Sequence, residues 1–309
     1  MSPNITTLPA IYQADSNRCL TTWYQANQQQ IAEQLLQHGA VLFRGFKVDN
    51  VDDFEQFTDS ALTDIGQYVG GATPRKQLTK SIATSTEFPD DQEIKLHNEL
   101  SYEIKIPNKL LFCCLTAPQS GGQTQIADVN KVLSLIKPEI IDSFNQKQGW
   151  KLIRNFGRGF GPGIAAGFGT TDIAKIKANC QKRHIEVECV DDNIIRTSQI
   201  RAAIHHHPVS NLPLWMNHVA FWHPSSLASE QLEIFSMLFA ADEFPYITLF
   251  GDGSEIPADY IDNIRSAYQQ AEMKFDWQQG DVMMVDNHRV CHGRKPYTGE
   301  RRIVVAMGD

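Results

Sequence analysis

The sequence predicts a single domain of mixed helices and strands that spans residues 1–309. Strand-like apolar segments occur in two regions, between Leu96 and Ala127 and between Lys274 and Met307, and helical repeats lie before and between them. No internal repeat and no flexible linker divides the chain, and a hydrophobic content of 42% is enough for one sizeable core. We therefore expect an α+β fold with a long insertion between its core strands.

Most of the expected helices combine an apolar repeat with a terminal signal. The helix over 28–38 stops before Gly39, and the helix over 51–62 starts after Asn50, a residue type that caps helix N-termini. Six glycines between Gly157 and Gly169 predict a mobile loop that covers an active site. Further helices are expected over 128–136, 138–146, 171–180, 225–242 and 258–270, and strands over 40–46, 274–277, 281–287 and 301–307.

Composition and charge exclude several classes of function. With a net charge of -8, a pI near 5.7 and no block of Lys or Arg, the chain is not suited to bind nucleic acid or an anionic membrane. No segment approaches the about 20 apolar residues that span a bilayer, and the first residues lack the pattern of a signal peptide. The six cysteines form no CxxC pair, and we interpret them as buried, reduced thiols. We expect a cytoplasmic protein that acts on a small molecule.

Residues 96–102, which read LHNELSY, place His97 and Glu99 two positions apart. If this stretch is a strand, both side chains lie on one face, because neighbouring side chains alternate between faces. An imidazole and a carboxylate in this arrangement are either two metal ligands or an ordinary hydrogen-bonded pair. The pattern by itself does not decide between the two interpretations.

A third candidate ligand lies near the C-terminus, where we expect His292 to end a strand. Two histidines and one carboxylate leave three coordination positions open, as in oxygen-activating Fe(II) sites, and two of these positions suit a 2-oxo acid. The second carboxylate of such a co-substrate needs a cation, and the fork of Arg binds a carboxylate bidentately. Of the adjacent Arg301 and Arg302, we expect Arg302 to point inward, because it shares a face with Val304 and Ala306. The alternative is two solvated charges on an edge strand.

These residues stand in segments that together resemble the taurine dioxygenase (TauD/TfdA) family of Fe(II)/2-oxoglutarate oxygenases. The similar branch contains syringomycin-type amino-acid hydroxylases, with clavaminate synthase as a more distant relative. The resemblance covers nearly the whole chain, and the order and spacing of its motifs make it specific. The motifs are GAVLFRGF, YVGGATPRKQL, TSTEFPDDQEIKLHNELSY, PQSGGQTQIAD, RNFG, HPVSNLPLWMNH and GDVMMVDNHRVCHGRKPYTGERRIVVAM.

The resemblance implies three sets of site residues. The iron ligands are His97, Glu99 and His292. The residues that hold the distal carboxylate of 2-oxoglutarate are Thr124 and Arg302. The residues that shape the substrate pocket are Arg75, Leu100, Phe156 and Ala306. The last of these stands where taurine dioxygenase has the arginine that binds a sulfonate, so a sulfonate substrate is disfavoured.

The resemblance also implies a fold and a reaction. The fold is a double-stranded β-helix, a jelly-roll and cupin-like core with helices packed outside. The expected reaction uses Fe(II), O₂ and 2-oxoglutarate to hydroxylate an aliphatic C–H of an amino acid or an amino-acid derivative in specialised metabolism such as antibiotic biosynthesis. The substrate is either free or tethered to a carrier protein, and the sequence leaves self-association into a homo-oligomer open.

Three alternatives to this function remain open from the sequence. The same oxygenase chemistry also gives desaturation or cyclisation of a free small molecule. A cupin-like metalloenzyme that does not use 2-oxoglutarate would keep the triad but would need neither Thr124 nor Arg302. A jelly-roll binding protein would need no catalytic residues at all.

Overall fold

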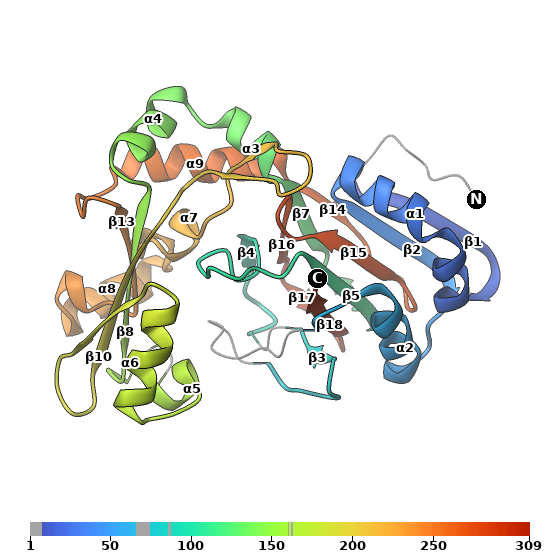
Figure 1. Cartoon of the computed structure of the whole chain (residues 1–309), viewed down its shortest axis with the longest axis horizontal. Coiled ribbons are helices and arrows are strands. Elements are labelled where there is room, and N and C mark those ends of the chain that lie inside the picture. The colour runs from blue at the N-terminus through green and yellow to red at the C-terminus, as the bar shows by residue number, and fades with distance from the viewer. Residues whose placement is uncertain (1–7, 66–74, 86–87, 160, 162) are drawn as a thin grey trace.

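Two β-sheets packed face to face form the centre of the structure, a computed structural model that describes residues 8–65, 75–85, 88–159, 161 and 163–309 (Figure 1). The larger sheet has the strand order β1-β2-β15-β5-β18-β3, and the smaller sheet has the order β14-β7-β16-β4. The strands of the larger sheet are β1 (Ala10–Cys19), β2 (Ala40–Lys47), β3 (Ala83–Thr84), β5 (Lys109–Thr116), β15 (Val282–Asp286) and β18 (Arg302–Gly308). Those of the smaller sheet are β4 (Ile94–His97), β7 (Thr124–Asp128), β14 (Met273–Phe275) and β16 (Val290–Arg294).

Apolar side chains from both sheets fill the space between them. Leu42, Phe112 and Val305 of the larger sheet belong to one buried cluster with Ile126 and Val290 of the smaller sheet. Strand β15 is buried along its whole length because its outer face is covered as well. The mixture of helices and sheets confirms the expected α+β class.

Two helices cover the outer face of the larger sheet: α1 (Leu20–His38) and α2 (Val51–Ala61). Trp23 of α1 and Phe57 of α2 both contact Phe43 of β2, with ring centroids 6.1 and 5.8 Å apart. The Asn50 side chain accepts a hydrogen bond from the Asp53 backbone N–H at 3.0 Å and so caps α2. The outward residues of the larger sheet are therefore as apolar as the inward ones.

A third sheet lies on the opposite side of the smaller sheet from α1 and α2, at the left of Figure 1. Its order is β13-β8-β10-β9, and its strands are β8 (Trp150–Phe156), β9 (Glu186–Cys189), β10 (Ile195–Arg201) and β13 (Tyr246–Phe250). The helices of this half are α3 (Val129–Leu135), α4 (Pro138–Gln146), α5 (Ile164–Phe168), α6 (Ile173–Lys182), α7 (Val219–Trp222), α8 (Ser229–Leu238) and α9 (Ala258–Ala271), with 3-10 turns at Pro224–Ser226 and Ala241–Glu243. Two short strand pairs join β6 (Ser120–Gly121) to β17 (Tyr297–Thr298) and β11 (His205–His206) to β12 (Pro213–Leu214).

The expected helices and strands are confirmed to within a few residues, apart from two helices. The first helix begins earlier, at Leu20, and the helix expected over 225–242 is the shorter α8, with a 3-10 turn on either side. Two expectations were wrong in detail. His292 lies in the middle of β16, because a turn after β15 starts a new strand. The segment from Gly157 to Gly169 follows β8 directly and contains the short helix α5, so only parts of it are loop, and its residues 160 and 162 lie outside the described residues.

The cysteine interpretation was only partly right. All six cysteines are free thiols, but Cys19 and Cys189 are exposed, while the other four are buried. No described helix is both long and apolar enough to cross a membrane. The expectation of one domain over residues 1–309 stays a prediction.

Gly39 offers a test of how tightly α1 is joined to the sheets. It ends α1 with a φ of 77°, and a Cβ built there would lie 2.5 Å from Cγ2 of Val290. We expect Gly39→Ala to lower the free energy of unfolding by about 1–3 kcal/mol, because the change adds backbone strain and a clash. Urea denaturation measures this, with Gly163→Ala as the control, because Gly163 has open space around it. Equal unfolding midpoints for the two variants would contradict the prediction.

Candidate active site

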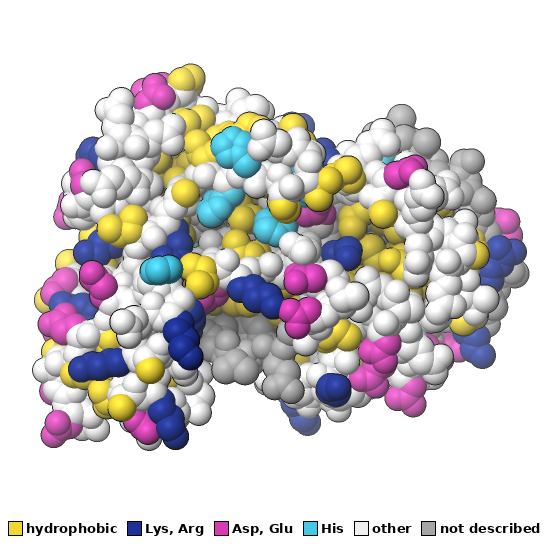
Figure 2. Space-filling model, in the orientation of Figure 1, with side chains coloured by type: hydrophobic (Ala, Val, Ile, Leu, Met, Phe, Trp, Pro, Cys, Tyr) yellow, Lys and Arg dark blue, Asp and Glu magenta, His cyan; other side chains and the backbone are white. Residues whose placement is uncertain are grey.

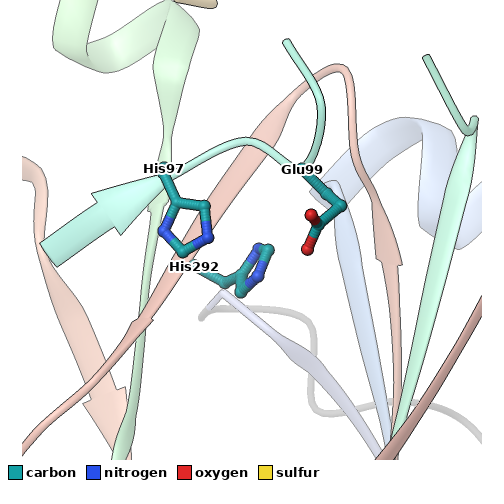
Figure 3. Close-up of side chains that lie close together, drawn as sticks. All are labelled: His97, Glu99 and His292. Carbon is teal, nitrogen blue, oxygen red and sulfur yellow. The ribbon is translucent and has the colours of Figure 1, made fainter. Parts of the chain in front are cut away.

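Three side chains that could hold a metal ion converge at one end of the smaller sheet (Figure 3). His97 is the last residue of β4 and pairs across the sheet with His292 of β16. Glu99 was expected on the same strand as His97, but it lies in the turn after β4. One ligand atom from each residue lies within 4.8 Å of the others, and no other such group occurs in the described part of the chain. The structure thus brings together the three residues that the sequence singled out.

The histidines of this group carry lone pairs suited to a metal. Burial is the main cause that lowers the pKa of both His97 and His292, so both imidazoles are neutral at pH 7. Nδ1 of His97 lies 2.8 Å from the Lys95 carbonyl oxygen and donates to it, which leaves Nε2 as the acceptor. Nδ1 of His292 is buried without a hydrogen-bond partner among the described residues. Two neutral histidines and one carboxylate are a suitable donor set for Fe(II).

Asn287 holds the turn that carries Glu99. It is fully buried, its Oδ1 accepts the Glu99 N–H at 2.8 Å, and its Nδ2 donates to the Glu99 carbonyl oxygen at 2.9 Å. The Asn98 amide donates in turn to the Asn287 carbonyl oxygen at 2.7 Å. Asn287 lies in the turn between β15 and β16, and His292 follows on β16. The hydrogen bonds of Asn287 therefore link the Glu99 turn to the third candidate ligand. We call these three hydrogen bonds the Asn287 clasp.

The residues after Glu99 form a strained and buried link to the second half of the molecule. Leu100 has a φ of 55°, which is rare for a large side chain. It packs against both the cluster between the sheets and the cluster under the helices. Ser101 then lies 2.7 Å from Nδ1 of His218, whose ring is 5.8 Å from that of His97. Leu100 therefore lies next to the candidate metal ligands, and its role in the substrate pocket stays a prediction.

A cavity of about 40 Å³ opens directly on the two histidines of the triad. It is lined by Arg75, Ser85, Ile94, His97, Phe112, Thr124, His292, Gly293, Arg294, Arg301, Ile303 and Val305. The Thr124 hydroxyl accepts a hydrogen bond from Nε1 of Trp277 at 2.9 Å, so its own proton is left to donate. Three arginines and no carboxylate line this space, which makes it a site for an anion.

The expectation that Arg302 points inward was wrong. Arg301 lines the cavity, is half-buried and donates to the Gly122 carbonyl oxygen at 3.1 Å, whereas Arg302 is exposed. Burial and the nearby Arg294 lower the pKa of Arg301 to about 10, so it is still a cation at pH 7. The inward face of β18 carries Ile303 and the residues at even steps from it, and a register shift separates Arg302 from Ile303.

Two of the residues expected in the substrate pocket do not line the cavity beside the triad. Ala306 is on the outer face of β18, in the cluster that packs under α1 and α2. Phe156 is fully buried in a small separate core, with its ring 4.6 Å from that of Phe168. Arg75 does reach the site, because it lines the cavity and forms an ion pair with the Glu99 carboxylate.

The three consecutive histidines at 205–207 are not part of the candidate metal group. His207 is buried and donates from Nε2 to the Asp286 carboxylate at 2.8 Å, while its Nδ1 accepts the backbone N–H of Ser210 at 3.0 Å. This histidine therefore fixes the loop against the end of β15. Asn211 completes the turn in the left-handed conformation, with a φ of 58°.

Sequence reasoning missed three residues of the site: Arg301, Trp277 and Asn287. The motif VDN contained Asn287, but nothing in a sequence shows that an amide folds back on a turn 188 residues away. Trp277 was visible only as part of a short strand. Figure 2 shows a hollow in the middle of one face of the molecule, with histidine side chains near its rim.

Comparison with known proteins identifies the family. The model of the taurine catabolism dioxygenase TauD, TfdA family matches residues 4–307. The dapdiamide synthesis protein DdaC of Enterobacter agglomerans is 37% identical over 279 residues, which cover 90% of this chain and 84% of that protein.

Solved structures share the fold at low identity. PvcB of Pseudomonas aeruginosa aligns with a TM-score of 0.56 at 14% identity and covers 96% of this chain and 84% of its own. An asparagine oxygenase aligns with a TM-score of 0.55 at 13% identity and covers 92% and 79%. Because the family model covers nearly the whole chain, the chain belongs to the TauD/TfdA family, and it is an Fe(II)- and 2-oxoglutarate-dependent oxygenase.

Asn287→Ala tests the role of the clasp. We expect the variant to lose about 1–3 kcal/mol of unfolding free energy, because the buried Glu99 N–H and carbonyl lose their partner. We also expect its affinity for Fe(II) to fall by about 10-fold or more, as is typical when a group that orients a ligand is removed. Metal titration of the folded variant measures the second effect. Asn130→Ala is the control, because Asn130 lies on α3 and its amide donates an exposed hydrogen bond to the Pro213 carbonyl oxygen. Unchanged metal affinity in Asn287→Ala would show that the clasp does not position Glu99.

Proposed function

We propose that this oxygenase hydroxylates an aliphatic C–H of an amino acid or an amino-acid derivative in a biosynthetic pathway. The observation that carries the proposal is the arrangement of one cavity, with His97 and His292 at one side and Thr124 and Arg301 also on its wall. Support from relatives is consistent with it: DdaC is named for dapdiamide synthesis, and the asparagine oxygenase structure contains hydroxyasparagine and succinate.

Within this proposal, His97, Glu99 and His292 hold Fe(II), which supplies the oxygen-activating chemistry of the family. The chain's own contribution is position and dryness. The Asn287 clasp fixes Glu99, and the hydrogen bond of His97 to the Lys95 carbonyl fixes its ring orientation. Buried surroundings keep both imidazoles neutral, so no proton competes for their lone pairs.

The distal carboxylate of 2-oxoglutarate is assigned to Arg301 together with Thr124. Arg301 offers a guanidinium fork, and the Thr124 hydroxyl has a proton free to donate because it accepts from Trp277. Arg302 is excluded from this role by its exposure. With Arg301 in place of Arg302, the position that corresponds to the sulfonate-binding arginine of taurine dioxygenase moves from Ala306 to Val305. Val305 is also apolar, so a sulfonate substrate stays disfavoured.

Several finer expectations belong to the same proposal. The two central sheets form a double-stranded β-helix, for which the shared core and the site at one end of the smaller sheet are the support. The substrate is a small molecule, and a cytoplasmic location, a carrier-protein partner and a homo-oligomer stay predictions. Use of 2-oxoglutarate by the family removes the cupin-like alternative that does without it.

Single substitutions at the two adjacent arginines test the assignment of the co-substrate. We expect Arg301→Ala to weaken 2-oxoglutarate binding by about 30-fold or more, because truncation leaves a buried carboxylate without its partner. Arg302→Ala, the matched control, changes it by less than about 2-fold because the side chain is exposed. The measurement is anaerobic titration of the Fe(II) protein with 2-oxoglutarate, followed by the weak visible charge-transfer band. The reverse ranking would mean that β18 has the other register in solution.

The reaction itself is tested by succinate release across a panel of free and carrier-bound amino acids. We expect one chemical class to stimulate succinate formation well above the substrate-free rate. Mass spectrometry of the product separates a gain of one oxygen atom, which indicates hydroxylation, from a loss of two hydrogens, which indicates desaturation or ring closure. His292→Ala serves as the inactive control. A protein that binds neither Fe(II) nor 2-oxoglutarate would contradict the proposed function.

A further inference from the structure

Arg154 is a buried cation surrounded by aromatic rings. It lies on β8, and only 6% of the residue is exposed. Its guanidinium carbon is 4.7 Å from the ring centroid of Phe156, 5.5 Å from that of Tyr246, 5.8 Å from that of Tyr102 and 5.9 Å from that of Trp222. Aromatic faces attract a cation, but they accept none of the directional hydrogen bonds that a guanidinium offers.

The donors of Arg154 have no acceptors among the described residues. Its Nε and Nη2 are buried without a hydrogen-bond partner, and no carboxylate of the described chain pairs with it. Two other arginines differ: Nε of the half-buried Arg183 donates to the Glu103 carboxylate at 2.8 Å, and the buried Arg294 donates to the carbonyls of Phe88 and Gln92 at 3.0 and 2.7 Å. A buried charge without a partner is strongly unfavourable. An anion bound at this position would remove that cost.

A series of ring contacts connects the cation with the candidate metal ligands. Trp222, which flanks Arg154, has its ring 4.4 Å from that of His218. The His218 ring is in turn 5.8 Å from that of His97. The positive charge of Arg154 also contributes, after burial and His97, to the lowered pKa of His218. The rings of Trp222 and His218 thus lie between Arg154 and His97 in this series, and Arg154 is not among the residues that line the cavity with Arg301.

We propose that Arg154 binds a carboxylate of the substrate, so that the substrate is a free acid rather than a carrier-bound thioester. The inference rests on the proposed function and deepens it. A carboxylate matches the guanidinium fork bidentately, and the surrounding rings exclude water and strengthen the pair. A substrate tethered to a carrier protein through its carboxyl group is a thioester at that position. It has no negative charge there to pair with Arg154. The aromatic rings then pack against the carbon skeleton that leads towards the metal.

The test compares free acids with their carboxamides in the Fe(II)-loaded enzyme. The probes are free amino acids and N-acyl amino acids, each beside its carboxamide, with succinate release as the readout. In the wild type we expect kcat/KM for the accepted acid to exceed that for its carboxamide by about 30-fold or more. Arg154→Gln loses that preference and loses about 30-fold or more on the acid. Its affinity for 2-oxoglutarate, read from the anaerobic charge-transfer band, stays within about 2-fold of the wild type.

Two further variants keep the inference falsifiable. Arg196→Gln is the matched control, because Arg196 lies on the neighbouring strand β10 and pairs with the exposed Asp242. It is expected to keep the preference for the acid. Arg154→Met replaces the cation by an apolar side chain of similar length. If Arg154 binds an anion and does not stabilise the fold, the urea midpoint of Arg154→Met is no lower than that of the wild type.

Each result separates this inference from the proposed function. Equal turnover of acid and carboxamide by the wild type, or full activity of Arg154→Gln on the acid, overturns the carboxylate assignment and leaves the oxygenase assignment intact. A panel in which no free acid stimulates succinate release more than its carboxamide overturns it as well. Failure to bind Fe(II) and 2-oxoglutarate overturns the proposed function instead.

Discussion

The Asn287 clasp is the contact on which the site depends. Two of the candidate ligands come from one segment, His97 and Glu99, but only His97 belongs to a strand. A carboxylate on a turn is free to move unless its backbone is held, and here both the N–H and the carbonyl of Glu99 bond to one buried amide. Because that amide sits in the turn between β15 and β16, the same contact sets the distance from Glu99 to His292.

The interior contains two regions that carry positively charged side chains, and the groups around these side chains differ. The small cavity beside the triad contains Arg75, Arg294 and Arg301, although the chain as a whole carries a net charge of -8. Arg294 is occupied by backbone carbonyls and Arg75 by Glu99, so Arg301 is the cation of this cavity best placed for a ligand. An acidic protein thus focuses positive potential on one interior anion site.

The second region belongs to the third sheet. Arg154 faces the rings of Tyr102 and Trp222, and the same loop that carries Glu99 continues through Leu100 to Tyr102. Substrate recognition and metal binding therefore share one stretch of backbone. This connection gives a physical route by which a substrate seated on the third sheet is positioned against the metal, without any contact to the 2-oxoglutarate end.

The sequence by itself determined most of the helices, the fold class and the candidate ligands His97 and Glu99, because these depend on local signals: Gly39 and Asn50 at helix ends, and two ligands in one motif. It failed at β18. That strand is buried on both sides, so Val304 and Ala306 are as apolar as Ile303 and Val305. The hydrophobic pattern therefore does not show which of the two faces of β18 points towards the cavity.

Only the tertiary structure decided which arginine points inward, because α1 and α2 cover the face of β18 that carries Val304 and Ala306, which leaves Arg301 on the face towards the cavity. The same holds for Phe156 and Arg154, two residues apart on β8. Packing of the third sheet placed the Phe156 ring in a small core and against the Arg154 guanidinium, which also faces Tyr102 of the loop that carries Glu99. Contacts between segments far apart in sequence set these outcomes, and no local pattern records them.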